Sequence, residues 1–214
     1  MTQLRRRLSA TALLSLFSIA QITVTSASAA APVGQPSDCD CTDDPPFIQD
    51  DVARAGLPLQ LDVLLRRLED PSCATAAVAA RALGTLAQAA ALGPLLVALR
   101  HRSCRVRVAA ADALAHFRDT AVVAGLTVAL RDADRRVRTD ATWSLSRIGD
   151  RTAVPALLRS SNDSSGQVRQ AAIAALGEIG DPRAAQTITA ALRDPEKHVR
   201  QAAAEALGRL RRAR

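Results

Sequence analysis

The sequence predicts an all-α protein, a solenoid of about five two-helix repeats with a period of 31 residues. One observation is a repeated phrase, "VRQAAIAALGEIG" from Val168 and "VRQAAAEALGRL" from Val199. A second is that its arginine and its leucine recur at the same spacing, as Arg107, Arg138, Arg169 and Arg200 and as Leu83, Leu114, Leu145, Leu176 and Leu207. A fixed period of about 20–50 residues is typical of a solenoid.

Each 31-residue unit is expected to form two helices. In the last unit, Asp181 and Pro182 are a helix-start signal, and Asp194–Glu196 interrupts the helical pattern. The second helix then has apolar residues spaced by three and four, namely Val199, Ala202, Ala203, Ala206, Leu207 and Leu210. The units align without gaps as 57–87, 88–118, 119–149, 150–180 and 181–211.

Alanine is the main packing residue of these helices. The chain is 48% hydrophobic but contains only three Phe, one Trp and no Tyr. Helices that pack through alanine approach toward the short end of the usual range of about 8–10 Å. A single helix pair cannot bury its own apolar face, so stacked pairs are expected to build one continuous core.

The repeated pattern D-x-x-A-V-x-x-L-x-x-A-L-R-D-x-x-x-x-V-R-x-A-A-x-x-A-L-x-x-I-G resembles the HEAT-like repeats of the phycobilisome lyase type over residues 57–211. The resemblance implies a right-handed α-solenoid whose second helices line a concave face. It also implies a ladder of ion pairs between units, formed here by Asp70, Asp132, Asp163 and Asp194 with Arg107, Arg138, Arg169 and Arg200. His101 replaces one aspartate and Ala76 one arginine, so the ladder is expected to weaken at its N-terminal end.

Residues 1–29 have the pattern of a secretory signal peptide. Three arginines precede an apolar stretch over about residues 10–22, which is shorter than the roughly 20 residues of a spanning helix. Ala27-Ser28-Ala29 fits a cleavage site, so the mature chain is expected to begin at Ala30. This predicts a bacterial periplasmic or extracellular protein, with the general and the twin-arginine export routes, and an uncleaved anchor, left as alternatives.

Residues 30–51 form an acidic lead before the repeats. The lead contains six Asp and no Lys or Arg, whereas residues 52–214 contain 25 Lys and Arg against 15 Asp and Glu. The net charge of +7 therefore combines +3 in residues 1–29, −6 in the lead and +10 in the repeat domain. Low hydrophobicity and like charge predict an extended lead, and Phe47, Ile48 and Val52 are expected to form a short cap on the first repeat.

Four cysteines, in an exported chain, favour disulfides. Cys39 and Cys41 lie in the lead, and Cys73 and Cys104 occupy the same position of adjacent repeats. Equivalent repeat positions are about 8–10 Å apart, whereas a disulfide needs Cα atoms within about 7 Å. Pairing of each lead cysteine with Cys73 or Cys104 is therefore preferred, in either order. A soft-metal site, a Cys39–Cys41 bond and free thiols are the alternatives.

No catalytic residue, metal or cofactor is predicted. His101, His116 and His198 occupy different repeat positions and none precedes a glutamate, so the iron site of the related deoxyhypusine hydroxylases does not transfer. The bilin lyases that share this repeat act in the cytoplasm, which conflicts with an export signal. Phosphate loops, nucleophile elbows and zinc signatures are absent from the sequence. A nucleic-acid partner is not expected either, because the basic excess is spread over all units.

The second helix of the third unit departs from the repeat. Small apolar positions of the other units are here Asp140, Thr142, Ser144 and Ser146. The outward position that holds Arg81, Asp112, Ala174 and Glu205 elsewhere holds Trp143. With Thr139 and Arg147 one turn away and Arg136 beyond, Trp143 is predicted to be an exposed partner-binding residue. Neutral drift, and a Trp143 packed over a gap beside Thr142 or Ser144, are the alternatives.

These observations favour an exported scaffold or adaptor that binds another protein through its concave face. Solenoids present long surfaces and need no chemistry of their own. An accessory subunit of a lyase- or oxidoreductase-like enzyme complex is the alternative. Neither the identity of the partner nor an oligomeric state is indicated by the sequence.

Overall fold

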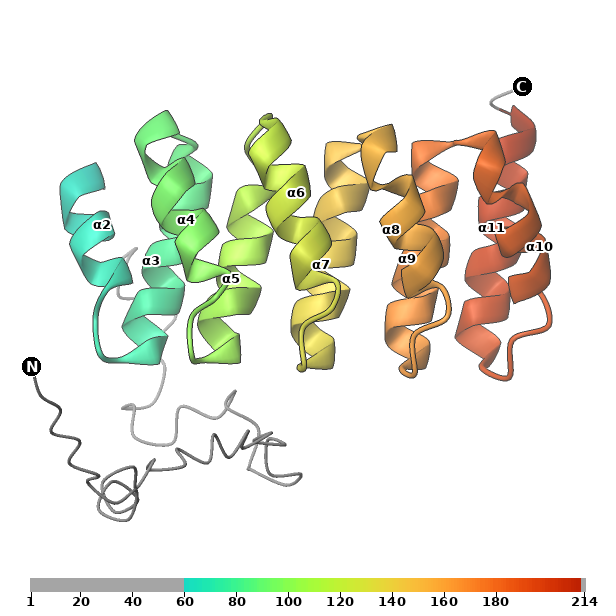
Figure 1. The fold of residues 1–214 in the computed structure, drawn as a ribbon, viewed down its shortest axis with the longest axis horizontal. Helices are drawn as coiled ribbons and strands as arrows, with labels where there is room; N and C mark the ends of the chain where they lie inside the picture. The colour runs from blue at the N-terminus through green and yellow to red at the C-terminus, as the bar shows by residue number, and fades with distance from the viewer. Residues whose placement is uncertain (1–59, 213–214) are drawn as a thin grey trace, which may run out of the picture. The chain divides into compact units, whose positions relative to one another are not determined.

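A computed structural model describes residues 60–212, in which it has ten α-helices, three short 3-10 helices and no strand. The predicted all-helical solenoid of two-helix repeats is confirmed (Figure 1). The first helices of the five units are α2 (Leu61–Leu68), α4 (Leu92–Ala98), α6 (Thr120–Ala129), α8 (Val154–Ser160) and α10 (Ala185–Ala191). The second helices are α3 (Cys73–Leu86), α5 (Cys104–Leu114), α7 (Arg135–Ile148), α9 (Gly166–Ile179) and α11 (Lys197–Arg212).

The 3-10 helices precede three of the first helices, as η1 (Ala89–Ala91), η2 (Arg151–Ala153) and η3 (Pro182–Ala184). The signal peptide predicted for residues 1–29 and the acidic lead of residues 30–51 lie outside the described residues. No described helix is both long enough and apolar enough to cross a membrane.

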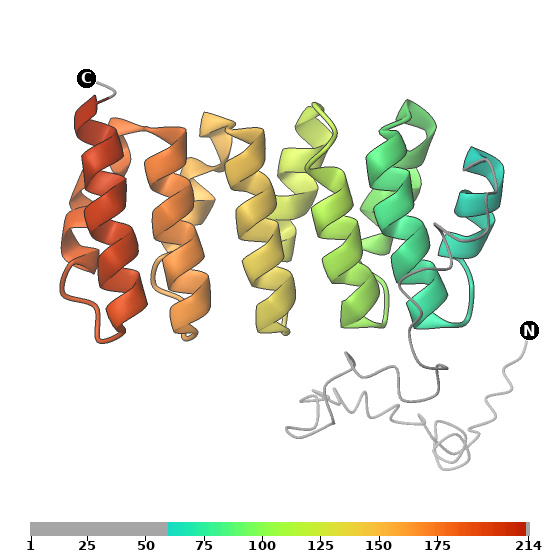
Figure 2. The same ribbon diagram turned by 180° about the vertical axis from the view of Figure 1, so that it is seen from behind.

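The helices form two parallel layers, the first helices on one face and the second helices on the other (Figures 1 and 2). Consecutive second helices pack closely along the whole row, whereas consecutive first helices contact one another sparsely. An array whose two layers differ in this way curves toward its second helices, as the family resemblance implied.

Small residues allow the second helices to approach. A Cβ atom added to Gly84 of α3 would lie 2.6 Å from the Cα of Ala113 in α5, and one added to Gly177 would lie 2.5 Å from the Cβ of Ala206. Any larger side chain at these two glycines would therefore push the helices apart. The layer between the two rows is filled by fully buried leucine, isoleucine and valine, including Leu114, Leu145 and Leu176.

Aspartates and glycines mark several helix ends, including the start predicted at Asp181. Asp119, Asp134, Asp150 and Asp181 each accept a hydrogen bond from the backbone N–H two residues on, at 2.7–2.9 Å. Helices α7 and α9 end at Gly149 (φ 72°) and Gly180 (φ 69°), both in the left-handed region that favours glycine.

A ladder of bidentate ion pairs joins neighbouring units. Three pairs repeat the same geometry, with arginine Nε 2.8 Å from one carboxylate oxygen and Nη2 2.9 Å from the other, namely Arg107–Asp132, Arg138–Asp163 and Arg169–Asp194. Their side chains are only 10–14% exposed. Each arginine also donates through Nη1 to two loop carbonyls of its own unit, as Arg138 does to Asp132 and Ala133. One guanidinium therefore fixes both its own loop and the next unit.

The ladder is shorter than predicted, because Asp70 and Arg200 form no ladder pair among residues 60–212. Each arginine pairs with the aspartate of the following unit, and Asp70 lies in the first unit, where, among the described residues, its carboxylate accepts only the Ser72 N–H at 2.8 Å.

His101 stands where the other loops have aspartate. Like the aspartates, it accepts a hydrogen bond from the backbone N–H two residues on, that of Ser103, at 3.0 Å, but it forms no ladder ion pair within residues 60–212. Burial, aided by Arg102 and Arg107, lowers the pKa of His101, which favours the neutral acceptor form. At the other end, Arg200 donates to the carbonyls of Asp194 and Pro195 but makes no ion pair within the described residues.

Two of the ladder carboxylates, Asp163 and Asp194, have lowered pKa values. Burial by itself would raise the pKa of Asp163, but hydrogen bonds from Arg138 and the Ser165 N–H lower it below the ordinary value. For Asp194, the hydrogen bond from Arg169 is the main cause of a lowered pKa. Since these pKa values are lower in the folded than in the unfolded chain, the pairs stabilise the fold above about pH 4 and less as the pH falls further.

We expect Arg138→Met to lower the free energy of unfolding at pH 7 by about 3 kcal/mol, because Asp163 would be left buried without its cation. Arg200→Met is the matched control, since this arginine occupies the same repeat position without a carboxylate partner, and it should cost about 1 kcal/mol. Urea unfolding followed by circular dichroism measures both. Equal losses would show that the cross-unit pair contributes nothing.

Candidate partner-binding surface

The second-helix face carries an exposed row of side chains on α7. Asp140, Trp143 and Arg147 are spaced by three and four residues and therefore lie on one side of the helix. Trp143 is 41% exposed. Arg136 lies two turns before it, exposed, with its guanidinium 3.5 Å from Asp134, and Thr139 is half-buried and bonded to the Arg135 carbonyl.

Two of the unusual polar residues of α7 are internal. Thr142 and Ser144 are buried, and the hydroxyl of each donates a hydrogen bond of 2.8 Å. Thr142 donates to the Arg138 carbonyl, and Ser144 donates to the Ala111 carbonyl of α5. Ser144 therefore joins two units through its hydrogen bond. Of the substitutions in this helix, Trp143 is exposed, Asp140 and Ser146 are half-buried, and Thr142 and Ser144 are buried.

Arg147 belongs to a charged group that spans two helices. Its Nη1 lies 2.7 Å from Oδ1 of Asp112 on α5, and its Nη2 lies 3.2 Å from Nε2 of His116 in the turn after α5. The sequence predicted that Trp143 is flanked by arginines available to a partner. Arg147 differs from this prediction, because its guanidinium already forms an ion pair with Asp112. Its charge is fixed in place beside the indole instead of being free to reorient.

Asp140 is the unusual carboxylate of this surface. Burial, followed by repulsion from Asp112 and opposed by Arg81, raises the pKa of Asp140 to about 6. Within residues 60–212 Asp140 forms no hydrogen bond or ion pair through its side chain. At neutral pH the surface thus holds an ionised, half-buried acid next to an exposed indole.

Of the residues at this surface, Trp143, Thr139, Arg136 and Arg147 were predicted as binding residues from the sequence. Four others were not, namely Arg81, Asp112, His116 and Asp140. The signal was present in the repeat alignment, since Arg81, Asp112 and Trp143 occupy one outward position in three consecutive units. Equivalent positions of adjacent second helices form a row across α3, α5 and α7. Arg147 and Asp112 occupy different repeat positions on neighbouring helices. Whether two such side chains meet depends on their length and conformation, which the repeat spacing does not give.

The cysteines of the repeats begin two second helices. Cys73 and Cys104 are the first residues of α3 and α5, and Cys104 is 1% exposed. Ser72 caps α3 through the Thr75 N–H, whereas the Ser103 side chain does not cap α5. Cys39 and Cys41 lie outside the described residues, so the cross-links predicted for them stay a prediction. Within the described range, no three His, Cys, Asp or Glu side chains are grouped to hold a metal.

Comparison with known proteins shows the family to which this chain belongs. The family model for HEAT repeats matches residues 61–145, 93–166 and 159–214, which together cover most of the chain. The chain belongs to the family of HEAT-repeat proteins. Among proteins with curated descriptions, none matches this sequence.

Several solved structures are similar to this fold. The complex of CpcE and CpcF of phycocyanin lyase from Nostoc sp. PCC7120 has a TM-score of 0.66 at 27% identity, covering 79% of this chain and 70% of that one. Human deoxyhypusine hydroxylase has a TM-score of 0.54 at 22% identity, covering 75% of this chain and 65% of that one. A designed armadillo repeat protein in complex with the peptide (KR)4 has a TM-score of 0.57 at 21% identity, covering 70% and 81%. The last two likenesses concern the fold alone.

Asp140→Asn is expected to raise the melting temperature at about pH 8 and to lose this advantage near pH 4. The pKa of Asp140 is about 6 in the folded chain, above that of an unfolded aspartate. The folded state therefore binds more protons between these values, and wild type gains relative stability as the pH falls through this window. Thermal melts across the pH range measure the difference.

Glu205→Gln is the control for Asp140→Asn, because it removes one negative charge from an exposed position on the second helix of the last unit. The same pH dependence in both variants would show that the environment of Asp140 is not the cause.

Proposed function

We propose that this chain is an exported HEAT-repeat scaffold or adaptor that binds another protein through its second-helix face. The observation that carries the proposal is Trp143, an indole 41% exposed at the middle of the array. Aromatic residues and arginine are enriched among residues that dominate binding energy. Since the second helices line the inner side of the array, a partner there can touch several units at once.

The surroundings of Trp143 support a rigid binding site. The Arg147–Asp112 ion pair and the contact of Arg147 with His116 place charged groups one helical turn after Trp143, and Asp140 lies about one turn before it. Charged groups that are already fixed lose little freedom on binding, which favours affinity. The raised pKa of Asp140 further supports a partner group that donates to it, such as a lysine, an arginine or a backbone N–H.

A second candidate is an accessory subunit of an enzyme complex. The likeness to the CpcE–CpcF complex, at 27% identity, favours it, since that assembly pairs repeat proteins in a lyase. The two candidates differ in the partner: an adaptor needs only a bound protein, whereas an accessory subunit changes the turnover of an enzyme that it binds. Assay of any captured enzyme with and without this chain separates them.

Trp143→Ala is expected to weaken partner binding by about 2 kcal/mol or more, roughly 30-fold in Kd. The loss of stability should stay well below the 3–5 kcal/mol or so of a fully buried aromatic residue. Partners captured from the exported fraction on the wild-type chain are titrated against both chains by calorimetry, and thermal melts follow the fold.

The matched control for Trp143→Ala is Glu205→Ala, at the same repeat position two units later. It should leave binding unchanged. Equal binding by the wild type and the Trp143 variant, or a melting temperature lowered as for a core residue, would place the interface elsewhere.

Export is the other part of the proposal, supported by the charged start, the short apolar stretch and Ala27-Ser28-Ala29. We expect the native protein to begin at Ala30 and to be recovered outside the cytoplasm. N-terminal sequencing of the protein purified from its own cells measures this. An intact Met1, or recovery from the cytosol alone, would contradict export.

A further inference from the structure

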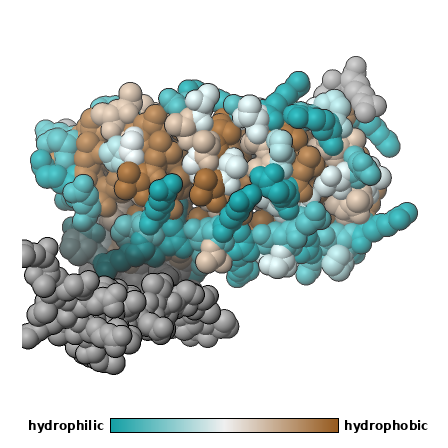
Figure 3. Space-filling model, in the orientation of Figure 1, coloured by the Kyte–Doolittle hydropathy of each residue, from teal (hydrophilic) through white to brown (hydrophobic). Residues whose placement is uncertain are grey.

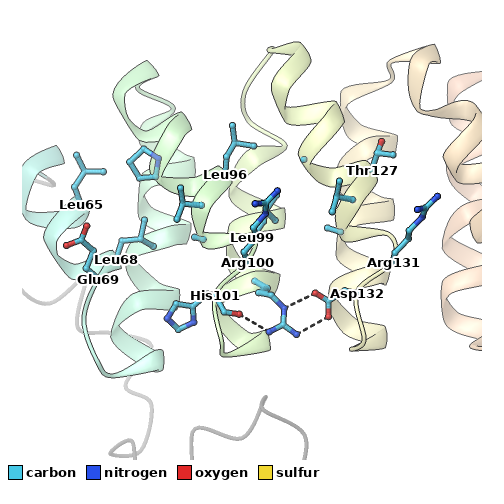
Figure 4. Close-up of a pocket in the computed structure, with 17 residues that line it drawn as sticks. Leu65, Leu68, Glu69, Leu96, Leu99, Arg100, His101, Thr127, Arg131 and Asp132 are labelled. Atoms are coloured by element: carbon cyan, nitrogen blue, oxygen red, sulfur yellow. Dashed lines mark hydrogen bonds and ion pairs between the residues drawn. The ribbon is translucent and has the colours of Figure 1, made fainter. Parts of the chain in front are cut away.

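The opposite face of the array holds an apolar groove of about 1610 Å³ between α2, α4 and α6 (Figure 4). Its lining includes Leu65, Leu68, Leu96, Val97, Leu99 and Val128. Val97 is 74% exposed and Val128 62%, the two highest values among the exposed large apolar residues. Figure 3 shows hydrophobic surface gathered over this N-terminal half of the first-helix face.

The groove is confined to the first three units. Val97 and Val128 occupy one repeat position, which holds Arg66 in the first unit and Arg159 in the fourth. The same position holds the small Ala190 in the fifth unit, so a large apolar side chain stands there only in the second and third units. Apolar side chains this exposed favour a covering partner, because burying them removes apolar area from water.

The groove also has a basic rim. Arg100 follows α4 and Arg131 follows α6, at one repeat position, and both are exposed (Figure 4). Neither forms an ion pair within residues 60–212. Of the two acids that line the groove, Asp132 is neutralised by Arg107, which leaves Glu69. An occupant should therefore combine apolar side chains with negative charge.

We propose that the occupant is this chain's own acidic lead, residues 42–51, with the sequence TDDPPFIQDD. Phe47 and Ile48 fit the apolar floor, and the aspartates on either side of them fit the basic rim. The two prolines before Phe47 favour an extended backbone, which suits a groove that crosses three helices. The lead thereby covers the apolar patch and cancels part of the positive charge of the first-helix face.

The length of the chain allows this docking. The described chain begins at Gln60, next to α2, which forms one wall of the groove. Ile48 is twelve residues earlier, so it can reach up to about 40 Å from that point. The groove also adjoins the cysteines, since its lining residues Glu69 and His101 precede Cys73 and Cys104 by four and three residues.

Disulfides from the lead to Cys73 and Cys104 would hold the segment beside the same units. That neither of these two thiols is free supports such links. The proposal does not require them, because chain length and charge complementarity carry it separately.

Two other occupants fit less well. A second copy of the chain, docked through this face about a two-fold axis, would bring two basic rims together. A basic peptide of the kind bound by the designed armadillo protein would meet Arg100 and Arg131 at the rim. An acidic, apolar segment that is already part of the chain also loses less freedom on docking than a separate partner would.

Photo-cross-linking of the whole mature chain tests the proposal. Val128 is replaced by p-benzoylphenylalanine, which its exposed position tolerates. The control carries the same residue at Arg159, the equivalent exposed position outside the groove. After irradiation, peptide mapping should find cross-links from position 128 to residues 42–51 within one chain, and none from position 159. Raising the salt concentration should reduce their yield, because the rim acts through charge.

A second pair of variants shows that the segment itself is recognised. In the chain that carries p-benzoylphenylalanine at position 128, the double substitution Phe47→Asp and Ile48→Asp should abolish the cross-links. The matched control Val33→Asp should leave them. Retention in the double variant, cross-links to other segments, covalent dimers in place of internal cross-links, or none at all would each overturn the proposal. Since Trp143 lies on the other face, failure here leaves the proposed function unaffected, and the reverse holds too.

Discussion

The bidentate pair between a second-helix arginine and the loop aspartate of the next unit holds this array in register. In each of three units the guanidinium uses Nε and Nη2 on the neighbour's carboxylate and Nη1 on two carbonyls of its own loop. The carboxylate in turn accepts the backbone N–H two residues on, as Asp163 does from Ser165. A single cluster therefore closes a loop, aligns the next helix pair and satisfies its own buried charges, which is the condition under which a buried ion pair is tolerated.

Close packing of the second helices makes the two faces of the protein different. Because glycine and alanine let α3 approach α5 and α9 approach α11, the second helices form a tight row. The first helices, attached to the outer side of that row, are held further apart. The inner face is thus continuous and suited to charged groups that reach across helices, such as Arg147 and Asp112. The outer face has a groove lined by valine and leucine.

This difference gives each face a separate role in the proposals. On the inner face, Trp143 lies among charges already fixed by hydrogen bonds, an arrangement suited to a partner with defined polar groups. On the outer face, the groove offers apolar area and a basic rim but little hydrogen-bonding specificity, which suits a tethered segment of the same chain. A scaffold that covers its own apolar face keeps the other face available, and avoids exposing a patch that favours aggregation.

The sequence by itself determined the repeat, its period and its two helices per unit, because each of these follows from spacing along one chain. The ladder was implied by the family resemblance, and six of its eight expected residues form it among the described residues. The sequence also determined that Trp143 lies outward, since three of the four equivalent residues in other units are charged. Only the tertiary structure decided that Arg147 is held by Asp112 and His116, and that Thr142 and Ser144 are buried and bonded. Val97 and Val128 share a repeat position with Arg66 and Arg159, which indicates an outward position, but the sequence does not show that they line one groove. Their exposure depends on the distance between first helices, which the packing of the other layer sets.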